Sequence, residues 1–268
     1  MSAEVVGLVP AAGRGKRISP LPCSKELYPV GFYQDANGED RPKVASHYLI
    51  EKFGKAGIAI AYVIVRDGKW DIPSYFGEGH SMGVKLAYIV ISDSLGPPDT
   101  LDRAYPFVQN KSVAFGFPDI IFGPTDAIAR LLRHLRTSGA EAVLGLYPAH
   151  DTRTMDMVDV GEDGRVHAMS LKPAFTHLRY SWLCAVWTPA LTQFMHEFVA
   201  HEVAKGTRDK GGYREIDAQG DLPVGAVLKA AIEHGLRVDG LTFPHETYID
   251  IGTPSSLSEA VRRYTALS

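Results

Sequence analysis

The chain has 268 residues, of which 45% are hydrophobic and 22% are charged, with a formal net charge of −3. This length allows one large core, and the near-neutral charge excludes a general nucleic-acid-binding surface. No apolar run approaches the roughly 18 residues that a membrane span needs. Two cysteines, Cys23 and Cys184, are too few for a disulfide framework, so we expect reduced thiols in a cytoplasmic protein.

The stretch from Val6 to Val30 organises the rest of the chain. An apolar run predicts a buried first strand, and Ala11 to Arg17 (AAGRGKR) follows as a glycine loop with three cations. Lys25 lies eight residues further on. Such a loop can cradle a polyphosphate with its backbone N–H groups. It differs from a P-loop, which ends in Gly-Lys-Ser/Thr, and from a dinucleotide fingerprint, whose third glycine is Ile18 here.

Strands and helices alternate through the first 150 residues. Near-continuous apolar runs predict central strands, and apolar residues at helical spacing predict the covering helices. We expect strands at 58–65, 84–91, 112–117 and 142–147, and helices at 44–56, 71–76 and 126–138. The polar segments 34–43 and 92–102 are expected to be loops, with a helix opening at Leu101 and interrupted at Pro106.

The second half is more mixed. A hairpin is predicted at 157–171, a strand at 180–187, a helix at 191–204, a polar connection at 205–220, a helix at 223–234, a strand at 236–243 and a last helix at 255–267. The predicted fold is a single α/β domain with a doubly wound, mixed but mainly parallel, Rossmann-like sheet and added β-hairpins in its second half.

Ligands bind at the carboxyl ends of the strands in such sheets. Asp119 directly follows the predicted fourth strand, and Asp250 lies in the turn at 248–254. Two carboxylates facing a cationic glycine loop form a site for a hard divalent ion that bridges phosphates, and Mg²⁺ prefers such ligands. Lys172 ends the predicted hairpin and is a further candidate.

These segments resemble the sugar-1-phosphate nucleotidyltransferases, also called nucleotide-sugar pyrophosphorylases, which include glucose-1-phosphate thymidylyltransferases and uridylyltransferases. The opening loop is similar to the family signature Gly-x-Gly-Thr-Arg, followed by Pro-Leu and Ser-Lys. The similarity continues, in the family's order, in four segments: 116–122 (GFPDIIF), 158–173, 214–217 (REID) and 248–254 (YIDIGTP).

The resemblance implies a reaction in which a sugar 1-phosphate attacks the α-phosphorus of a nucleoside triphosphate and pyrophosphate leaves. Residues 1–150 would form the nucleotide-binding half and 151–268 the sugar-phosphate-binding half. The implied roles are catalysis for Arg17 and Lys25, nucleotide binding for Ala11, Ala12, Gly13, Arg14, Gly15, Lys16 and Arg103, sugar-phosphate binding for Lys172 and Glu215, and Mg²⁺ binding for Asp119 and Asp250. The family's dimers and tetramers predict self-association.

Two specificity elements depart from the family pattern. Leu171 stands where the family has a glutamate that holds sugar hydroxyls, and Asp156 stands where it has a glycine. Arg103 replaces a glutamine that pairs with a pyrimidine, so the base stays undefined. Besides an NDP-sugar synthase, two alternatives therefore stay open: a cytidylyltransferase acting on a non-sugar phosphate or phosphonate, and a non-catalytic regulatory homologue that binds a sugar nucleotide. A nicotinamide-binding Rossmann protein is disfavoured, because no acidic residue about 20 positions after the loop stands in the right context at the end of a strand.

Overall fold

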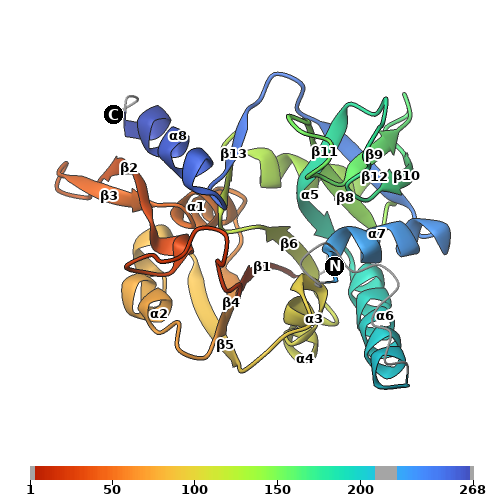
Figure 1. The fold of residues 1–268 in the computed structure, drawn as a ribbon, viewed down its shortest axis with the longest axis horizontal. Helices are drawn as coiled ribbons and strands as arrows, with labels where there is room; N and C mark the ends of the chain where they lie inside the picture. Colours follow the sequence, from red (N-terminus) through yellow and green to blue (C-terminus); the bar gives the residue numbers. More distant parts are fainter. Residues whose placement is uncertain (1–3, 209–221, 266–268) are drawn as a thin grey trace.

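The computed structural model describes residues 4–208 and 222–265, and its main sheet has nine strands in these residues (Figure 1). These strands are β1 (Val5–Ala11), β4 (Ile60–Arg66), β5 (Lys85–Ile91), β6 (Ser112–Gly116), β8 (Ala142–Pro148), β9 (Met157–Val160), β10 (Val166–Ser170), β11 (Tyr180–Trp187) and β12 (Val238–Thr242). β6, β1, β4 and β5 are parallel neighbours, and β12 runs parallel to β8. The predicted mixed, mainly parallel α/β sheet is confirmed.

β11 joins the two halves of the sheet. It is antiparallel to both of its long neighbours, with Cys184 to Trp187 facing β6 and most of the strand facing β8. Its first residues, Tyr180 and Ser181, pair with β9, which forms the predicted hairpin with β10. The hairpin therefore continues the main sheet and does not form a separate domain.

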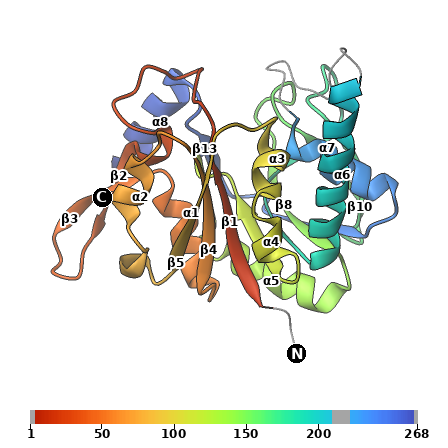
Figure 2. The same cartoon turned by 90° about the horizontal axis from the view of Figure 1, so that it is seen from below.

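Helices cover both faces of the sheet, because each face is apolar. The described helices are α1 (His47–Lys55), α2 (Asp71–Phe76), α3 (Pro97–Asp102), α4 (Tyr105–Val108), α5 (Ala127–Ser138), α6 (Pro189–Arg208), α7 (Val224–Glu233) and α8 (Pro254–Thr265), with short 3-10 helices at Lys25–Leu27 and His80–Met82. α1 and α5 pack on one face through residues such as Phe53 and Leu131. α3, α4, α6 and α7 pack on the other, as Figure 2 shows around β1.

Two small antiparallel sheets stand beside the main one. β2 (Pro29–Gln34) pairs with β3 (Asp40–Val44), and β7 (Ile120–Phe122) pairs with β13 (Tyr248–Asp250). A third apolar cluster, which includes Val30, Ile121 and Leu257, joins them beneath α8. This cluster attaches the C-terminal segment to the region that follows β6.

Three local predictions were wrong. The segment 34–43 is a hairpin, since β3 begins at Asp40 and the Asp35 side chain accepts N–H bonds from Asn37 and Glu39 across the turn. The segment 92–102 contains α3, because prolines favour the first turn of a helix. The turn at 248–254 contains β13.

The predicted polar connection at 205–220 begins within α6, which runs to Arg208, and from residue 209 it lies outside the described residues. Within the described residues, the other elements shift only at their bounds. The helix expected at 44–56 begins at His47, because Val44 belongs to β3. Pro106 lies in the first turn of α4 and does not interrupt a helix. Among the described residues, no helix is long and apolar enough to cross a bilayer.

Candidate active site

Four residues singled out in the sequence meet at one edge of the sheet. The Lys25 ammonium forms an ion pair with Oδ2 of Asp119, although 94 residues separate them. Asp119 immediately precedes β7, and Asp250 pairs with Ile120 at the end of β13. The Ile251 N–H donates to the Asp119 carbonyl at 3.0 Å. The β7–β13 ladder therefore brings the two predicted carboxylates side by side.

Arg17 completes this group through close contact with Gly252. A Cβ added to Gly252 would lie 2.8 Å from Nη2 of Arg17 and 2.9 Å from Oδ1 of Asp250. The Gly252 N–H donates to the same Asp250 oxygen at 2.7 Å. A side chain at position 252 would press on the end of the Arg17 side chain, so the glycine lets the guanidinium approach the second carboxylate.

The charges of the group shift one another's pKa values. Burial alone would raise the pKa of Asp119, but the Lys25 ammonium outweighs it and holds this pKa below its usual value. Burial and the negative charge of Asp119 raise the pKa of Asp250. Burial acts to lower the pKa of Lys25, yet Asp119 and Glu26 outweigh it and raise that pKa. The arrangement is a compact set of opposed charges with two neighbouring carboxylates.

These two carboxylates fit a magnesium ion. Mg²⁺ is commonly held by one or two protein carboxylates together with phosphate oxygens and water. The repulsion between Asp119 and Asp250, which helps to raise the pKa of Asp250, is what a divalent cation would relieve. In the described part of the chain, no three His, Cys, Asp or Glu residues gather into a closed metal cluster.

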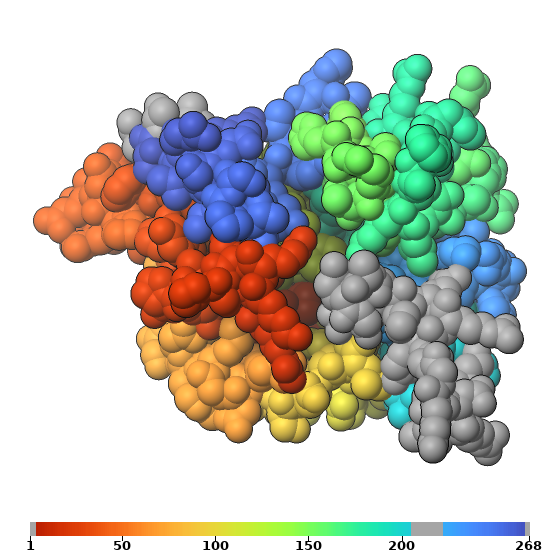
Figure 3. Space-filling model, in the orientation of Figure 1, coloured from red at the N-terminus to blue at the C-terminus, as the bar shows by residue number. Residues whose placement is uncertain are grey.

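A cavity of about 320 Å³ lies beside the glycine loop. Gly13, Arg14, Gly15 and Lys25 line one side, and the turn from Gly68 to Asp71 lines the other. In the space-filling view, a recess separates the red N-terminal loop from the green second half of the chain (Figure 3). The glycine loop therefore borders open space on two sides: the cavity against residues 68–71 and the recess against the second half of the chain (Figure 3).

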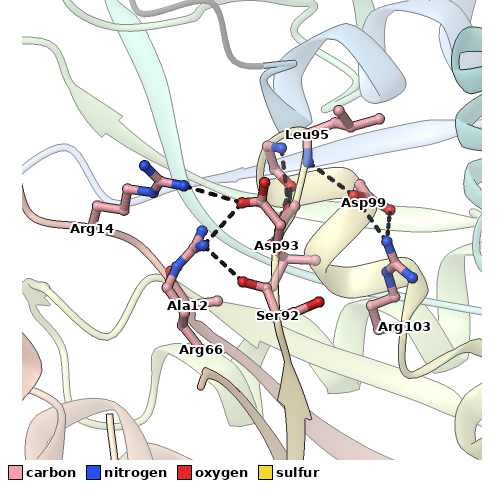
Figure 4. A network of polar contacts seen from close by, with 11 residues as sticks. Ala12, Arg14, Arg66, Ser92, Asp93, Leu95, Asp99 and Arg103 are labelled. Atoms are coloured by element: carbon pink, nitrogen blue, oxygen red, sulfur yellow. Dashed lines mark hydrogen bonds and ion pairs between the residues drawn. The ribbon is translucent and has the colours of Figure 1, made fainter. Parts of the chain in front are cut away.

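The other predicted nucleotide-binding residues have varied surroundings. Arg14 pairs with Asp93 at 3.3 Å, and both side chains are exposed (Figure 4). Lys16 is exposed on the loop. Arg103 pairs with Asp99, one turn earlier in α3, at 3.2 Å. Arg103 therefore points along its own helix, and its contact with a base stays a prediction.

The predicted sugar side is less tightly built. Lys172 is exposed, with a φ of 42°, and is the one non-glycine residue with positive φ in the described ranges 4–208 and 222–265. Since Met157 pairs with Ser170, Asp156 and Leu171 lie opposite each other at the open end of the hairpin. A Cβ on Gly225 of α7 would meet both of their side chains. Glu215 lies outside the described residues.

No sequence motif marked the turn from Gly68 to Asp71, which faces the glycine loop across the cavity. Asp71 accepts bonds from the Ser24 N–H at 2.6 Å and from the Ser24 hydroxyl at 2.8 Å. Lys69 pairs with Glu26 at 2.8 Å. Lys69 and Asp71 follow β4 at the carboxyl edge of the sheet, so their place after a strand is the sequence signal that could have identified them.

Comparisons with known proteins agree with this geometry. A family model described as nucleotidyl transferase matches residues 6–266. The chain is 22% identical, over 95% of its length, to the low-salt glycan biosynthesis nucleotidyltransferase Agl11 of Haloferax volcanii, and 28% identical, over 62%, to a glucose-1-phosphate thymidylyltransferase of Streptomyces antibioticus. It spans 64% and 44% of those two proteins.

Solved structures share the fold. A candidate glucose-1-phosphate thymidylyltransferase from Bacillus anthracis superposes with a TM-score of 0.78 at 18% identity, covering 97% of this chain and 95% of that one. A UDP-glucose pyrophosphorylase complexed with UDP-glucose superposes with a TM-score of 0.77 at 14% identity, covering 97% and 98%.

Proposed function

The chain belongs to the nucleotidyl transferase family, and we propose that it joins a nucleoside triphosphate to a sugar 1-phosphate, forming an NDP-sugar and pyrophosphate. The observation that carries this proposal is the convergence of Arg17, Lys25, Asp119 and Asp250 beside the glycine loop. The names of the Haloferax and Streptomyces relatives support the sugar-phosphate class.

The reaction needs positioning and charge neutralisation more than proton transfer. An oxygen of the sugar phosphate attacks the α-phosphorus, and the bond from that phosphorus to the bridging oxygen of the β-phosphate breaks. The attacking phosphate is already ionised at pH 7, so no general base is required. The chain's part is to align the reactants and to stabilise charge on the transferring phosphoryl group.

Each cation of the site would bind a different phosphate group. Arg17, with its planar fork of donors, suits the departing pyrophosphate. Lys25 is paired with Asp119, and we expect its ammonium to exchange that carboxylate for the α-phosphate when nucleotide binds. Lys172 would receive the phosphate of the second substrate.

Asp119 and Asp250 would hold the magnesium ion. When bound, this ion supplies positive charge to the α-phosphate and thus stabilises the transition state. The two carboxylates contribute its fixed ligands from paired strands, and the Gly252 N–H keeps one Asp250 oxygen oriented.

A second candidate is a cytidylyltransferase that acts on a non-sugar phosphate or phosphonate. Leu171 and Asp156 favour it, because an apolar side chain and a carboxylate at the hairpin mouth suit a substrate without a ring of hydroxyls. A regulatory homologue that binds a sugar nucleotide without turnover is the third hypothesis. A cytoplasmic location and self-association stay predictions.

Pyrophosphate release separates these candidates. Each of the common nucleoside triphosphates would be paired with hexose 1-phosphates and with non-sugar phosphates, in the presence of Mg²⁺. We expect turnover with at least one hexose 1-phosphate. Turnover confined to non-sugar acceptors would favour the second candidate. Tight NDP-sugar binding by calorimetry, with no turnover for any pair, would favour the regulatory one.

A further inference from the structure

The end of β4 and the turn after it carry two cations, Arg66 and Lys69, to which the mechanism above gives no part. The Lys69 ammonium donates to the carbonyl oxygens of Ala11, at 2.8 Å, and Gly13, at 3.1 Å. The Arg66 Nε donates to the carbonyl between them, that of Ala12, at 3.0 Å. Three consecutive carbonyls of the glycine loop are thus held by one cation at the end of β4 and one in the turn that follows.

This contact fixes the direction of the loop's N–H groups. In a planar trans peptide, the N–H points opposite to the C=O of the same unit, and none of these three peptides is cis. The N–H groups of residues 12, 13 and 14 therefore each point away from the cation that holds the paired carbonyl. Consecutive N–H groups released in this way can form an anion-binding concavity.

The same turn also holds the segment that bears Lys25. Lys69 pairs at 2.8 Å with Glu26, whose side chain is almost fully buried, next to Lys25 in the 3-10 helix. Asp71 holds Ser24 on the other side of Lys25. Lys69 therefore touches both the loop and the helix of Lys25, so it sets the spacing between them.

Arg66 extends this support to the loop after β5. Its Nη1 donates to the Ser92 carbonyl at 3.0 Å and to Asp93 at 2.9 Å, as Figure 4 shows. Asp93 in turn accepts a bond from Arg14 of the glycine loop. One guanidinium thus connects the ends of β1 and β5.

We propose that Lys69 and Arg66 are positioning residues for the phosphate site. They hold the glycine-loop carbonyls on the side away from the polyphosphate, and Lys69 fixes Lys25 beside the N–H groups that face it. This inference rests on the proposed function. Lys69 acts through the loop and through Glu26.

Lys43 offers a matched control for the simpler explanation, a buried ion pair that serves only stability. Lys43 pairs with Glu51 at 2.7 Å between β3 and α1, and its side chain is as well buried as that of Lys69. A Lys43→Met variant therefore removes an equally buried lysine from a Lys–Glu pair without touching the loop, although Glu51 is more exposed than Glu26.

The test is calorimetric titration with inorganic pyrophosphate and Mg²⁺, together with steady-state kinetics. We expect Lys69→Met to weaken pyrophosphate binding about tenfold and to lower kcat by up to about 100-fold, as small misplacements do. The KM for the second substrate should stay within about twofold. Lys69→Arg, which keeps a charged donor, should recover most of the binding, and Lys43→Met should change neither quantity.

Equal effects of Lys69→Met and Lys43→Met, or an equal rise in both substrates' KM values, would overturn the inference. Should Lys69→Met fail to fold, Arg66→Lys keeps the charge but cannot span Ala12, Ser92 and Asp93, and we expect it to weaken pyrophosphate binding about threefold. Absence of wild-type turnover with intact pyrophosphate binding would refute the proposed function alone. If the wild-type chain binds no pyrophosphate, both fail.

Discussion

The two sides of the recess are built differently. On the glycine-loop side, Lys25, Glu26 and Lys69 are mostly buried, and each has a partner from a distant part of the chain. On the hairpin side, Lys172 is exposed beyond the end of β10. Under the proposed function, this difference predicts that phosphate chemistry depends on the framework of the fold and acceptor choice on a short surface segment. Variants on the two sides should therefore change different kinetic constants.

The largest loss is expected on the framework side, from Asp250→Asn. The amide can still accept the Gly252 N–H, but it removes the negative charge that a metal ion needs. We expect kcat to fall by about 10²–10³-fold, with unfolding temperature nearly unchanged. Asp239→Asn is the control, because Asp239 is a buried carboxylate that bonds His134 and Arg237 away from the site. The Asp239→Asn variant should be less stable and have an unchanged kcat. If Asp239→Asn lowered kcat more than Asp250→Asn did, the proposed site would be wrong.

Lys172→Ala is the matching change on the hairpin side. We expect about a tenfold rise in the KM for the acceptor phosphate, since a charge-assisted bond is lost, and unchanged pyrophosphate binding. Arg165→Ala, at the far turn of the same hairpin, should be silent in both assays. If Lys172→Ala weakened pyrophosphate binding and left the KM for the acceptor unchanged, the proposed difference between the two sides would be wrong.

Leu171→Glu tests what the hairpin mouth selects. A carboxylate at this position can accept bonds from sugar hydroxyls, so kcat/KM for a hexose 1-phosphate should rise about threefold. Its cross-strand neighbour Asp156 would repel the new charge, and the double variant with Asp156→Gly should gain more. The Leu171→Gln variant adds polar atoms without a charge, so it shows whether a gain with Leu171→Glu comes from the charge or from hydrogen bonding. No gain in any of the three would favour a non-sugar acceptor.

The smallest effect on activity is expected from Lys52→Met, within the framework but outside the phosphate contacts. Lys52 lies over the Phe122 ring, and burial lowers its pKa from 10.5 to about 8. Both folded and unfolded chains carry the charge below pH 8, so its burial destabilises the fold by up to roughly 3 kcal/mol. This cost falls as pH rises from 8 to 10.5.

Urea unfolding should therefore find Lys52→Met more stable than wild type at pH 7, with the gap narrowing towards pH 10. Turnover should stay unchanged. A constant gap across that range would show that packing, and not charge, accounts for the difference.

Sequence patterns predicted the long elements and the residues at their carboxyl ends. The apolar runs of β4 and β6 and the spacing of α5 are strong local signals, and the order of motifs identified Asp119 and Asp250. The β7–β13 ladder was not predicted, because three-residue strands carry no periodicity. The hairpin at 29–44 was missed because β3 begins with exposed polar residues.

Lys69 and Arg66 could not be recognised for a different reason. A lone cation after a strand has no motif, and its value here comes from carbonyl directions that only the folded loop defines. Sequence can indicate which side chains bear charge, but it cannot show which main-chain atoms those charges orient.

The β7–β13 ladder has a consequence for protein synthesis. It joins Ile120 to Asp250, so the second carboxylate and the strand that aligns the first arrive 130 residues after Ile120 has been made. Domains begin to fold from the N-terminus while the ribosome is still translating. If the proposed site is right, we therefore expect a nascent chain to form its glycine loop early and to remain inactive until Asp250 has emerged.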